Sequence, residues 1–291
     1  MPDLKTGEIL DGKAVAMQLQ EKLKDEVESF RKDGKRPPGL AVVLVGDNPA
    51  SELYVRNKIS ACKKVGIDSV LERLEKSATT DEIIEVIEKL NCDQAIDGIL
   101  VQLPLPDGLE EKAILDCILP GKDVDGLHPY NLGCLLAGAP GLRPCTPSGI
   151  IILLEHYQVP LAGANAVVVG RSKLVGKPAA LLLMEKNATV TICHSRTKNL
   201  EQLIGQADIV VVAIGKSQFV KGSWIRANAV VVDVGIHYDR LENGKRLITG
   251  DVEFDSARKV ARLITPVPGG VGPMTVAQLL ANTLMSYKSR I

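Results

Sequence analysis

Residues 166–178 read AVVVGRSKLVGKP and predict a strand, a glycine-bearing turn and a helix in direct succession. The run from Ala166 to Gly170 carries no charge, which is typical of a parallel strand buried on both faces. Pro178 opens the apolar segment AALLLMEK, and proline is favoured at the first position of a helix because its missing N–H has no partner there. A helix N-terminus carries free N–H groups and partial positive charge, so this stretch could hold a phosphate.

The glycines of this turn do not follow the usual dinucleotide fingerprint. Gly170 and Gly176 have Arg171, Lys173 and Lys177 around them, whereas the fingerprint has the pattern G-x-G-x-x-G. A tight strand-to-helix turn of any α/β domain would also explain these glycines. The turn alone therefore leaves cofactor binding open.

The next predicted strand, residues 188–193, favours NADP as the cofactor. It follows the first strand by roughly 20 residues, where a dinucleotide-binding fold places the residue that contacts the adenosine ribose. An enzyme that prefers NAD usually carries Asp or Glu there, whereas this chain has Ser195 and Arg196, with Arg171 on the neighbouring turn. A guanidinium forms paired hydrogen bonds with the 2′-phosphate of NADP. Alternatively, Ser195 and Arg196 cap a strand at a wet surface.

Length and composition describe an ordinary globular protein. A chain of 291 residues predicts about two domains. Its 35 basic residues balance 35 acidic ones, which argues against a nucleic acid or a membrane surface as partner. No apolar run approaches the ~18 residues that span a bilayer.

Targeting and cysteine patterns indicate the cytoplasm. The first ten residues, MPDLKTGEIL, have no apolar core, so we expect no signal peptide. The six cysteines are scattered without a C-x-x-C pair, so we expect reduced thiols and no bound metal.

Alternating strand and helix patterns predict an α/β fold of two domains, the second a Rossmann-like parallel sheet. We expect a C-terminal helix over 276–291 and, before it, a rigid loop over 263–275 rich in proline and glycine. Thr146 or Ser148 is expected to cap the helix that begins near residue 149. The predicted strands cover residues 40–46, 70–74, 99–101, 166–170, 188–193, 208–215 and 229–235, and the other predicted helices include 11–32, 80–90 and one opened by Asp47, Asn48 or Ser51.

Three side chains share one face of the helix that follows the strand at 40–46. Ser51, Tyr54 and Lys58 lie three and four residues apart, which is helical spacing. Such a row is more often a solvated face with one packed aromatic residue than a binding surface. Gln102, at the end of the strand 99–101, would lie at the sheet edge where α/β proteins bind ligands, or could be a solvated strand exit.

The segment around Asp125 and the one around Cys145 leave further alternatives open. Asp123 and Asp125 flank Val124 before a glycine, and they could form a turn or hold the amidine-like edge of a ligand. Cys145 could be a nucleophile, but no activating pair lies nearby in the sequence, so a structural cysteine is the better interpretation. Gly215 and Gly235 end two predicted strands, where glycine allows a ligand to approach the backbone.

Taken together, several segments resemble the methylenetetrahydrofolate dehydrogenase/cyclohydrolase family of one-carbon folate metabolism. The segments are SELYVRNK (51–58), IDGILVQLPLP (96–106), KDVDGLHP (122–129), PCTPSG (144–149), GRSKLVGKP (170–178), CHSRT (193–197) and PVPGGVGPMT (266–275). They occur in the order of the family and cover nearly the full length. We expect the stand-alone form, because no large formate-ligase extension follows.

The resemblance implies two domains facing each other across a cleft. Residues 1–147 would carry most of the folate site, with the helix 275–291 packing back on them, and residues 148–274 would bind NADP. The enzyme would oxidise 5,10-methylenetetrahydrofolate with NADP and hydrolyse the methenyl product to 10-formyltetrahydrofolate, a step towards purine biosynthesis. It would act as a homodimer, without metal, nucleic acid or membrane.

The resemblance also assigns roles to individual residues. Lys58 matches the catalytic lysine, Tyr54 the tyrosine that stacks on the folate, and Gln102 the residue that works beside the lysine. Asp125 matches the carboxylate that binds the pterin. The remaining substrate positions are Ser51, Pro268, Gly269 and Gly270, and the cofactor positions are Gly170, Arg171, Ser172, Gly176, Pro178, His194, Ser195, Arg196, Gly215, Gly235, Ile236 and Thr275.

Two other functions compete with this interpretation. An NADP reductase of similar layout, such as a shikimate-dehydrogenase-like enzyme, would lack the tyrosine–lysine row and the carboxylate at Asp125. A catalytically silent nucleotide-binding regulator would not need Lys58 and Gln102. Two departures from the family pattern stand out: Arg143 precedes PCTP where an apolar or aromatic residue is expected, and Arg196 lies in a variable part of the cofactor motif.

Overall fold

The computed structural model describes residues 7–240 and 246–291, and these form two compact units. The three-stranded unit contains residues 17–145 and 276–291, and the six-stranded unit contains residues 7–16, 146–240 and 246–275. Residues 1–6, part of the segment in which we expect no signal peptide, lie outside the described residues.

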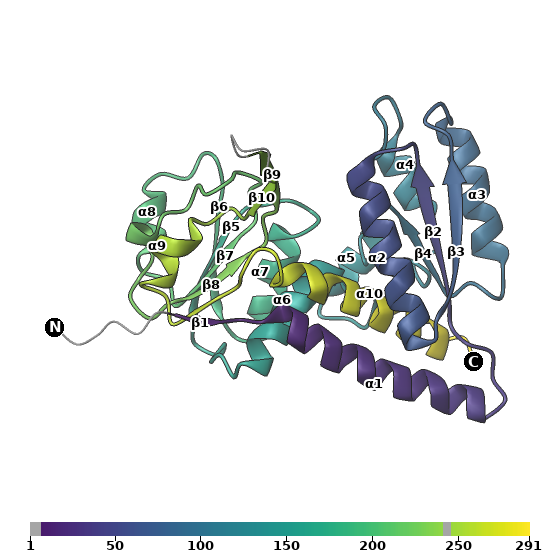
Figure 1. Cartoon of the computed structure of the whole chain (residues 1–291), viewed down its shortest axis with the longest axis horizontal. Coiled ribbons are helices and arrows are strands. Elements are labelled where there is room, and N and C mark those ends of the chain that lie inside the picture. The colour runs from purple at the N-terminus through teal and green to yellow at the C-terminus, as the bar shows by residue number, and fades with distance from the viewer. Residues whose placement is uncertain (1–6, 241–245) are drawn as a thin grey trace. The chain divides into compact units, whose positions relative to one another are not determined.

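The three-stranded unit has a parallel sheet with the order β3-β2-β4. Its helices cover both faces: α1, α2 and α10 pack on one, and α3 and α4 pack on the other (Figure 1). The central strand β2 is buried along its whole length, which matches its continuous apolar run. The elements are α1 (Gly12–Lys32), β2 (Gly39–Val45), α2 (Pro49–Val65), β3 (Asp68–Leu74), α3 (Thr80–Cys92), β4 (Gly98–Val101), α4 (Glu111–Asp116), α5 (Pro129–Leu136) and α10 (Val271–Lys288).

Helix α2 begins where the sequence predicted a cap. Among the three candidates, Asn48 is the N-cap, and its side chain accepts hydrogen bonds from the N–H groups of Ala50 and Ser51. Pro49 follows at the first helical position, where it sacrifices no hydrogen bond. The cap fixes where α2 begins, and Tyr54 and Lys58, four residues apart, lie on the same face of this helix.

The six-stranded unit has a parallel sheet with the order β1-β11-β8-β7-β5-β6. The chain runs from β5 to β6 on one side and then returns to β7 on the other side of β5, so β5 and β7 mark the switch point of the sheet. The elements are β1 (Glu8–Ile9), α6 (Cys145–His156), β5 (Asn165–Val169), α7 (Gly176–Glu185), β6 (Thr189–Cys193), α8 (Leu200–Ile204), β7 (Ile209–Val212), the 3-10 turn η1 (Gly222–Trp224), β8 (Val230–Asp233), the hairpin β9 (His237–Arg240) and β10 (Arg246–Thr249), α9 (Phe254–Arg258) and β11 (Leu263–Ile264).

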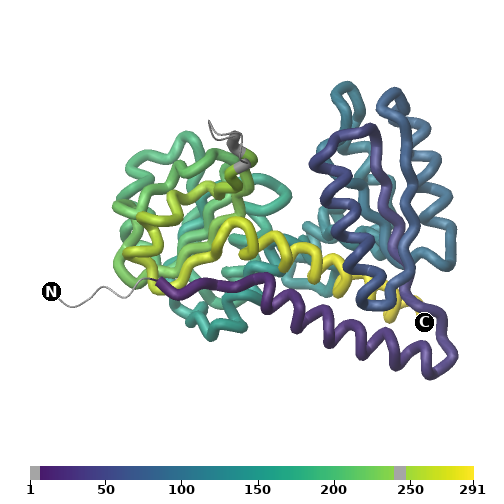
Figure 2. The backbone as a smooth tube through the Cα atoms, viewed as in Figure 1, coloured from purple at the N-terminus to yellow at the C-terminus, as the bar shows by residue number. Residues whose placement is uncertain are grey.

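The N-terminal residues belong to the six-stranded unit, whereas the sequence placed them in the first domain. The reason is that β1 pairs in parallel with β11. Figure 2 shows the first described residues beside the segment that contains β11. Strand β1 is only two residues long and has no periodicity that a sequence could reveal. The helices α1, α6 and α10 each contain one boundary between the units.

Three local predictions were wrong. Residues 263–275 contain the strand β11, and α10 begins at Val271, because Gly272 and Pro273 are tolerated in a first helical turn where N–H groups have no partner. Neither predicted residue caps α6: the helix already begins at Cys145. Pro178 is the third residue of α7, not the first, and its missing N–H is still among those without an intrahelical partner.

Candidate active site

Lys58 and Gln102 meet in the three-stranded unit. Nζ of Lys58, on α2, donates a hydrogen bond to Oε1 of Gln102 at 2.9 Å. Gln102 directly follows β4, and its Nε2 donates to the carbonyl of Leu103 at 2.6 Å, which turns the amide oxygen towards the lysine. Neither residue is a fully solvated side chain, which was the alternative for each: Gln102 is buried and Lys58 is half-buried.

The pKa of Lys58 lies below the ordinary value of a lysine. Burial is the main cause, because it disfavours the ammonium, and the negative charge of Asp125 opposes it. In turn, burial raises the pKa of Asp125, and the positive charge of Lys58 opposes that rise. The two groups therefore form an electrostatically coupled acid–base pair.

Cys145 lies against Asp125 and stays a thiol. Burial and the negative charge of Asp125 raise its pKa well above the ordinary value. Its Sγ donates to the carbonyl of Val124 at 3.2 Å. Since the nucleophile would be the thiolate, these contacts support the structural role predicted for Cys145.

The loop that carries Asp125 is held by buried polar side chains on both sides. The ammonium of Lys122 donates to the carbonyls of Leu90, Asn91 and Asp93 at 2.7–2.9 Å, at the end of α3. Asp123 accepts from the N–H of His128 and from Nδ2 of Asn131, both at 2.8 Å. These contacts fix the backbone before and after Val124.

Asn282, on α10, joins this loop to the segment before Cys145. Its Nδ2 donates to the carbonyls of Val124 and Arg143, both at 2.8 Å, and the residue is 1% exposed. Sequence reasoning assigned no role to Asn282 or to Lys122, although Lys122 opens the segment KDVDGLHP, because no local pattern marks either residue as buried. Only their separation from solvent and their long-range partners identify them.

Tyr54 and Ser51 lie on α2 with Lys58. Tyr54 is half-buried, whereas Ser51 is only 2% exposed. Among the described residues, Oγ of Ser51 finds no hydrogen-bond partner. A buried hydroxyl without a partner is costly, so a ligand could supply one.

The predicted cofactor residues gather at one edge of the six-stranded sheet. Because its strands are parallel, their carboxyl ends share an edge. The residues follow β5 (Gly170, Arg171, Ser172), β6 (His194, Ser195, Arg196), β7 (Gly215) and β8 (Gly235, Ile236), or open α7 (Gly176, Pro178), and the predicted substrate residues Pro268, Gly269 and Gly270 follow β11. Thr275, on α10, shares a hydrogen bond of 2.9 Å with Thr146.

The turn after β5 is built by Ser172 and Gly170. Oγ of Ser172 accepts hydrogen bonds from the N–H groups of Val175 and Gly176 at 3.1 and 3.3 Å, which stabilises the start of α7. Gly170 has a φ of 135°, and a Cβ there would overlap the carbonyl of Ala213 after β7. The loops on both sides of the switch point therefore pack backbone to backbone.

The turn after β6 exposes the side chains that favour NADP. Oγ1 of Thr197 accepts from the N–H of His194 at 2.8 Å, and Nδ1 of His194 accepts from the N–H of Arg196 at 3.1 Å. His194 thus shapes the turn, and the side chains of Ser195 and Arg196 are exposed, as is that of Arg171 on the neighbouring turn. No carboxylate occupies this turn, and the groups present fit a phosphate on the ribose.

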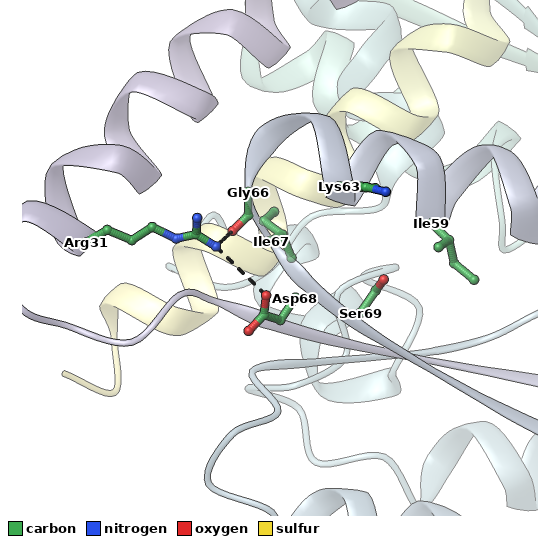
Figure 3. A pocket seen from close by; sticks show the side chains of 7 residues that line it. All are labelled: Arg31, Ile59, Lys63, Gly66, Ile67, Asp68 and Ser69. Atoms are coloured by element: carbon green, nitrogen blue, oxygen red, sulfur yellow. Dashed lines mark hydrogen bonds and ion pairs between the residues drawn. The ribbon is translucent and has the colours of Figure 1, made fainter.

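A cavity of about 310 Å³ lies elsewhere, between α1, α2 and β3 (Figure 3). Arg31 at its wall donates to the carbonyl of Gly66 at 3.1 Å and lies 3.9 Å from Asp68, so its charge is already compensated. Lys58, Gln102 and Asp125 do not line it. This cavity is therefore separate from the cluster of Lys58, Gln102 and Asp125.

The fold and these two groups of residues define the class: an α/β enzyme with a parallel-sheet dinucleotide-binding domain and a catalytic domain of its own. Family models agree in detail. Residues 10–125 match the catalytic domain of tetrahydrofolate dehydrogenase/cyclohydrolase, and residues 144–291 match the NAD(P)-binding domain of the same enzymes. The chain belongs to the tetrahydrofolate dehydrogenase/cyclohydrolase family, which decides against the shikimate-dehydrogenase-like alternative.

Individual relatives agree with the family models. The chain is 52% identical to the "Bifunctional protein FolD" of Maridesulfovibrio salexigens, over 98% of this chain and 99% of that protein. The crystal structure of the bifunctional enzyme FolD from Campylobacter jejuni is 45% identical, with a TM-score of 0.92 over 97% of this chain and 99% of that one. The Trypanosoma brucei FolD, crystallised with NADP and an inhibitor, is 39% identical, with a TM-score of 0.93 over 99% of each chain.

No helix in the described ranges 7–240 and 246–291 is long and apolar enough to cross a membrane. In the same ranges no cluster of three or more histidine, cysteine or acidic side chains could hold a metal ion. All six cysteines are free thiols.

Proposed function

We propose that this protein oxidises 5,10-methylenetetrahydrofolate to 5,10-methenyltetrahydrofolate with NADP, and then hydrolyses that product to 10-formyltetrahydrofolate. The observation that carries the proposal is the hydrogen bond between Lys58 and Gln102 in a chain of this family. Lys58 is a lysine whose pKa is lowered by burial, and its partner Gln102 has a fixed orientation.

In the oxidation, the residues of the protein position the folate. A bound NADP would supply the hydride acceptor. No proton has to leave the methylene carbon, so orientation is the main task of the protein. Tyr54 would stack on the folate, and the carboxylate of Asp125 would accept hydrogen bonds from the aminopyrimidine edge. Ser51 would give its unpartnered hydroxyl to the substrate. That the folate and the cofactor meet in a cleft, with Gly269 and Gly270 at its back, stays a prediction.

The hydrolysis is the step that moves protons. Water forms a bond to the methenyl carbon and loses one proton, and the ring C–N bond then breaks while the hydroxyl proton moves to the departing ring nitrogen. A neutral Lys58 can accept the first proton and release it to solvent, and it can then relay the hydroxyl proton to the ring nitrogen; burial enlarges the neutral fraction of the amine near pH 7. Gln102 would orient the amine or the water.

NADP specificity rests on the residues at the carboxyl edge of β5 and β6. Arg171 and Arg196 project from adjacent turns, because Val169 and Cys193 are paired in register where the two strands end. Ser195 adds a hydroxyl, and the turn lacks the carboxylate that would repel a 2′-phosphate. Gly176 and Pro178 open α7, whose N-terminus would favour the pyrophosphate.

A single absorbance experiment tests the proposal. The purified chain is given 5,10-methylenetetrahydrofolate and NADP, and we expect NADPH to form and the methenyl product to decay further. Absence of NADPH would favour the silent regulator. Decay of added methenyltetrahydrofolate no faster than in buffer would remove the hydrolase half of the proposal.

We further propose a cytoplasmic homodimer. The free thiols support a reducing compartment. Strand β6 is an edge of the six-stranded sheet, and Ile192 on it is 42% exposed, which is a pairing hazard that a second copy could cover. Sedimentation at micromolar concentration would detect the dimer, and a monomer mass would contradict it.

A further inference from the structure

Asp251 is a buried carboxylate that the proposed mechanism does not use. It follows the hairpin strand β10, has no exposed surface, and accepts four hydrogen bonds. Oδ2 accepts from the N–H groups of Ile214 and Gly215 at 2.7 and 3.0 Å. Oδ1 accepts from the N–H of Lys216 at 2.9 Å and is 2.8 Å from Nε2 of His237.

The turn that Asp251 holds, residues 213–216, lies at the switch point of the sheet. It follows β7 directly, beside the turn after β5, and the N–H of Ala213 donates to the carbonyl of Val169 at 2.8 Å. Open α/β sheets bind their ligands outside the carboxyl ends of the strands at this point. Gly215 has a φ of 68°, and the space where a Cβ would lie is open.

Three successive N–H groups around such a glycine form a concave anion site. In many nucleotide-binding proteins a phosphate occupies such a site, whereas here the carboxylate of Asp251 occupies it. The N–H groups of residues 214–216 are therefore not available to the phosphates of a dinucleotide. A part of the cofactor without negative charge fits this turn better.

A second carboxylate fixes Asp251 in place. Asp233, at the end of β8, accepts from the N–H of Asp251 at 2.9 Å through Oδ1 and from the N–H of Val252 at 2.9 Å through Oδ2. A Cβ at Gly235 would overlap the carboxylate of Asp251, and one at Gly250 would overlap that of Asp233. The two glycines leave the room that the two buried carboxylates require.

We propose that Asp251 is a positioning residue of the cofactor site, which presets the turn at 213–216 to receive the nicotinamide–ribose half of NADP. The inference rests on the NADP-dependent function proposed above. Asp251 acts through the turn and does not touch the reacting atoms. The pyrophosphate and 2′-phosphate are left to α7 and to the turns after β5 and β6.

The test compares the variant Asp251→Asn with a matched control, Asp208→Asn, in the full chain. Asp208 also accepts a backbone hydrogen bond, from Asn165 at 2.9 Å, but at the opposite edge of the same sheet. The dissociation constants of NADP and of adenosine 2′,5′-bisphosphate, which lacks the nicotinamide half, are measured by titration. We expect Asp251→Asn to weaken NADP binding at least tenfold and to leave the bisphosphate within twofold, while Asp208→Asn changes neither.

Other outcomes separate the alternatives. Equal weakening of both compounds would mean that Asp251 only supports the fold, and unchanged NADP binding would also overturn the inference. Wild-type protein that binds neither compound would contradict the proposed function itself.

Hydrogen exchange of the wild-type chain tests the inference without a variant. We expect the amides of Ile214, Gly215 and Lys216 to be protected before NADP is added, because the carboxylate already holds them. Amides that exchange rapidly and become protected only with NADP would show that the turn is not preset, which overturns the inference even if Asp251→Asn fails to fold.

Discussion

Nζ of Lys58 lies 2.9 Å from Oε1 of Gln102, whose amide is held at its other end by the carbonyl of Leu103. The amine therefore has one fixed direction towards the strand end, while burial favours its neutral form. An amine that has a fixed orientation and a lowered pKa can exchange protons with a bound substrate more readily than an ordinary lysine. The predictions for the catalytic unit follow from this pair.

Replacement of Lys58 by methionine is expected to separate the two activities. The aliphatic bulk remains and the amine is lost, so hydrolysis of methenyltetrahydrofolate should fall by at least ~10²–10⁴-fold, the typical contribution of a general acid–base group. Dehydrogenase activity should survive in part, because the contacts of Tyr54 and Asp125 would still hold the folate. Methenyl absorbance and NADPH formation are followed separately.

The control for this prediction is Lys64→Met, on an exposed position of the same helix. It should keep both rates and the wild-type melting profile. Hydrolysis near the wild-type rate in Lys58→Met would rule out proton transfer by Lys58, and loss of both activities together with folate binding would make it a positioning residue.

The pH dependence of hydrolysis should respond to Asp125. The carboxylate raises the pKa of Lys58 against the effect of burial, so Asp125→Asn should lower that pKa further. Because the neutral amine is the active form, the rising limb of kcat against pH should move to lower pH. Gln102→Glu, which adds a negative charge beside Nζ, should move it to higher pH. The uncatalysed rate is subtracted from each profile. If the rising limb does not move in either variant, it does not report the ionisation of Lys58.

Arg171→Ala should discriminate between the cofactors. A charge-assisted hydrogen bond contributes ~1.5–3 kcal/mol, so the KM for NADP should rise roughly 10- to 100-fold, and the KM for NAD should rise far less. Lys259→Ala, an exposed cation of the same unit, should change neither. Equal losses with both cofactors would place Arg171 at the shared pyrophosphate or in a purely structural role.

Asn282→Leu should impair the substrate site from a distance. It removes the amide that donates to the carbonyls of Val124 and Arg143, and a buried acceptor that loses its partner costs about 1–3 kcal/mol. We expect a lower free energy of unfolding in urea and a raised KM for folate in both reactions. Gln278→Leu, which removes only the bond to Asn282 at 2.8 Å, is the milder comparison. A wild-type KM would show that the loop of Asp125 holds itself.

The six-stranded unit should carry a pH signature from Asp233. Burial is the main cause that raises its pKa to about 6, against about 3.9 for an unperturbed aspartate. A raised folded-state pKa contributes stability that is complete below about pH 4 and lost as the pH rises through about 6. The free energy of unfolding of the wild type, relative to Asp233→Asn, should therefore fall by roughly 3 kcal/mol over that window. A constant difference would contradict the raised pKa.

Local sequence patterns were sufficient where a short segment carries the whole signal. The valines of β5 and β2 predicted buried parallel strands because no polar residue interrupts them, and both strands are buried. Asn48 was one of three cap candidates, and the predicted α3 starts at the capping box of Thr79 and Glu82. The motif order along the chain was enough to identify the family.

These local patterns could not predict contacts between residues that are far apart in the sequence. Strand β11 looked like a loop because proline and glycine follow it at once, and only its pairing with β8 and β1 makes it a strand. Thr146 looked like a cap, but its hydroxyl is bonded to Thr275. In each case a long-range partner replaced the local one.

The sequence by itself determined the fold class, the family and the set of residues from which the site is built, because burial runs, caps and motif order are local properties. Only the tertiary structure decided what those residues meet. Lys58 gains Gln102 and a shifted pKa because α2 and the end of β4 pack together. Asp251 captures the turn after β7 because β7, β8 and the hairpin bring distant backbone into one buried place, where an unpaired carboxylate would be too costly to keep.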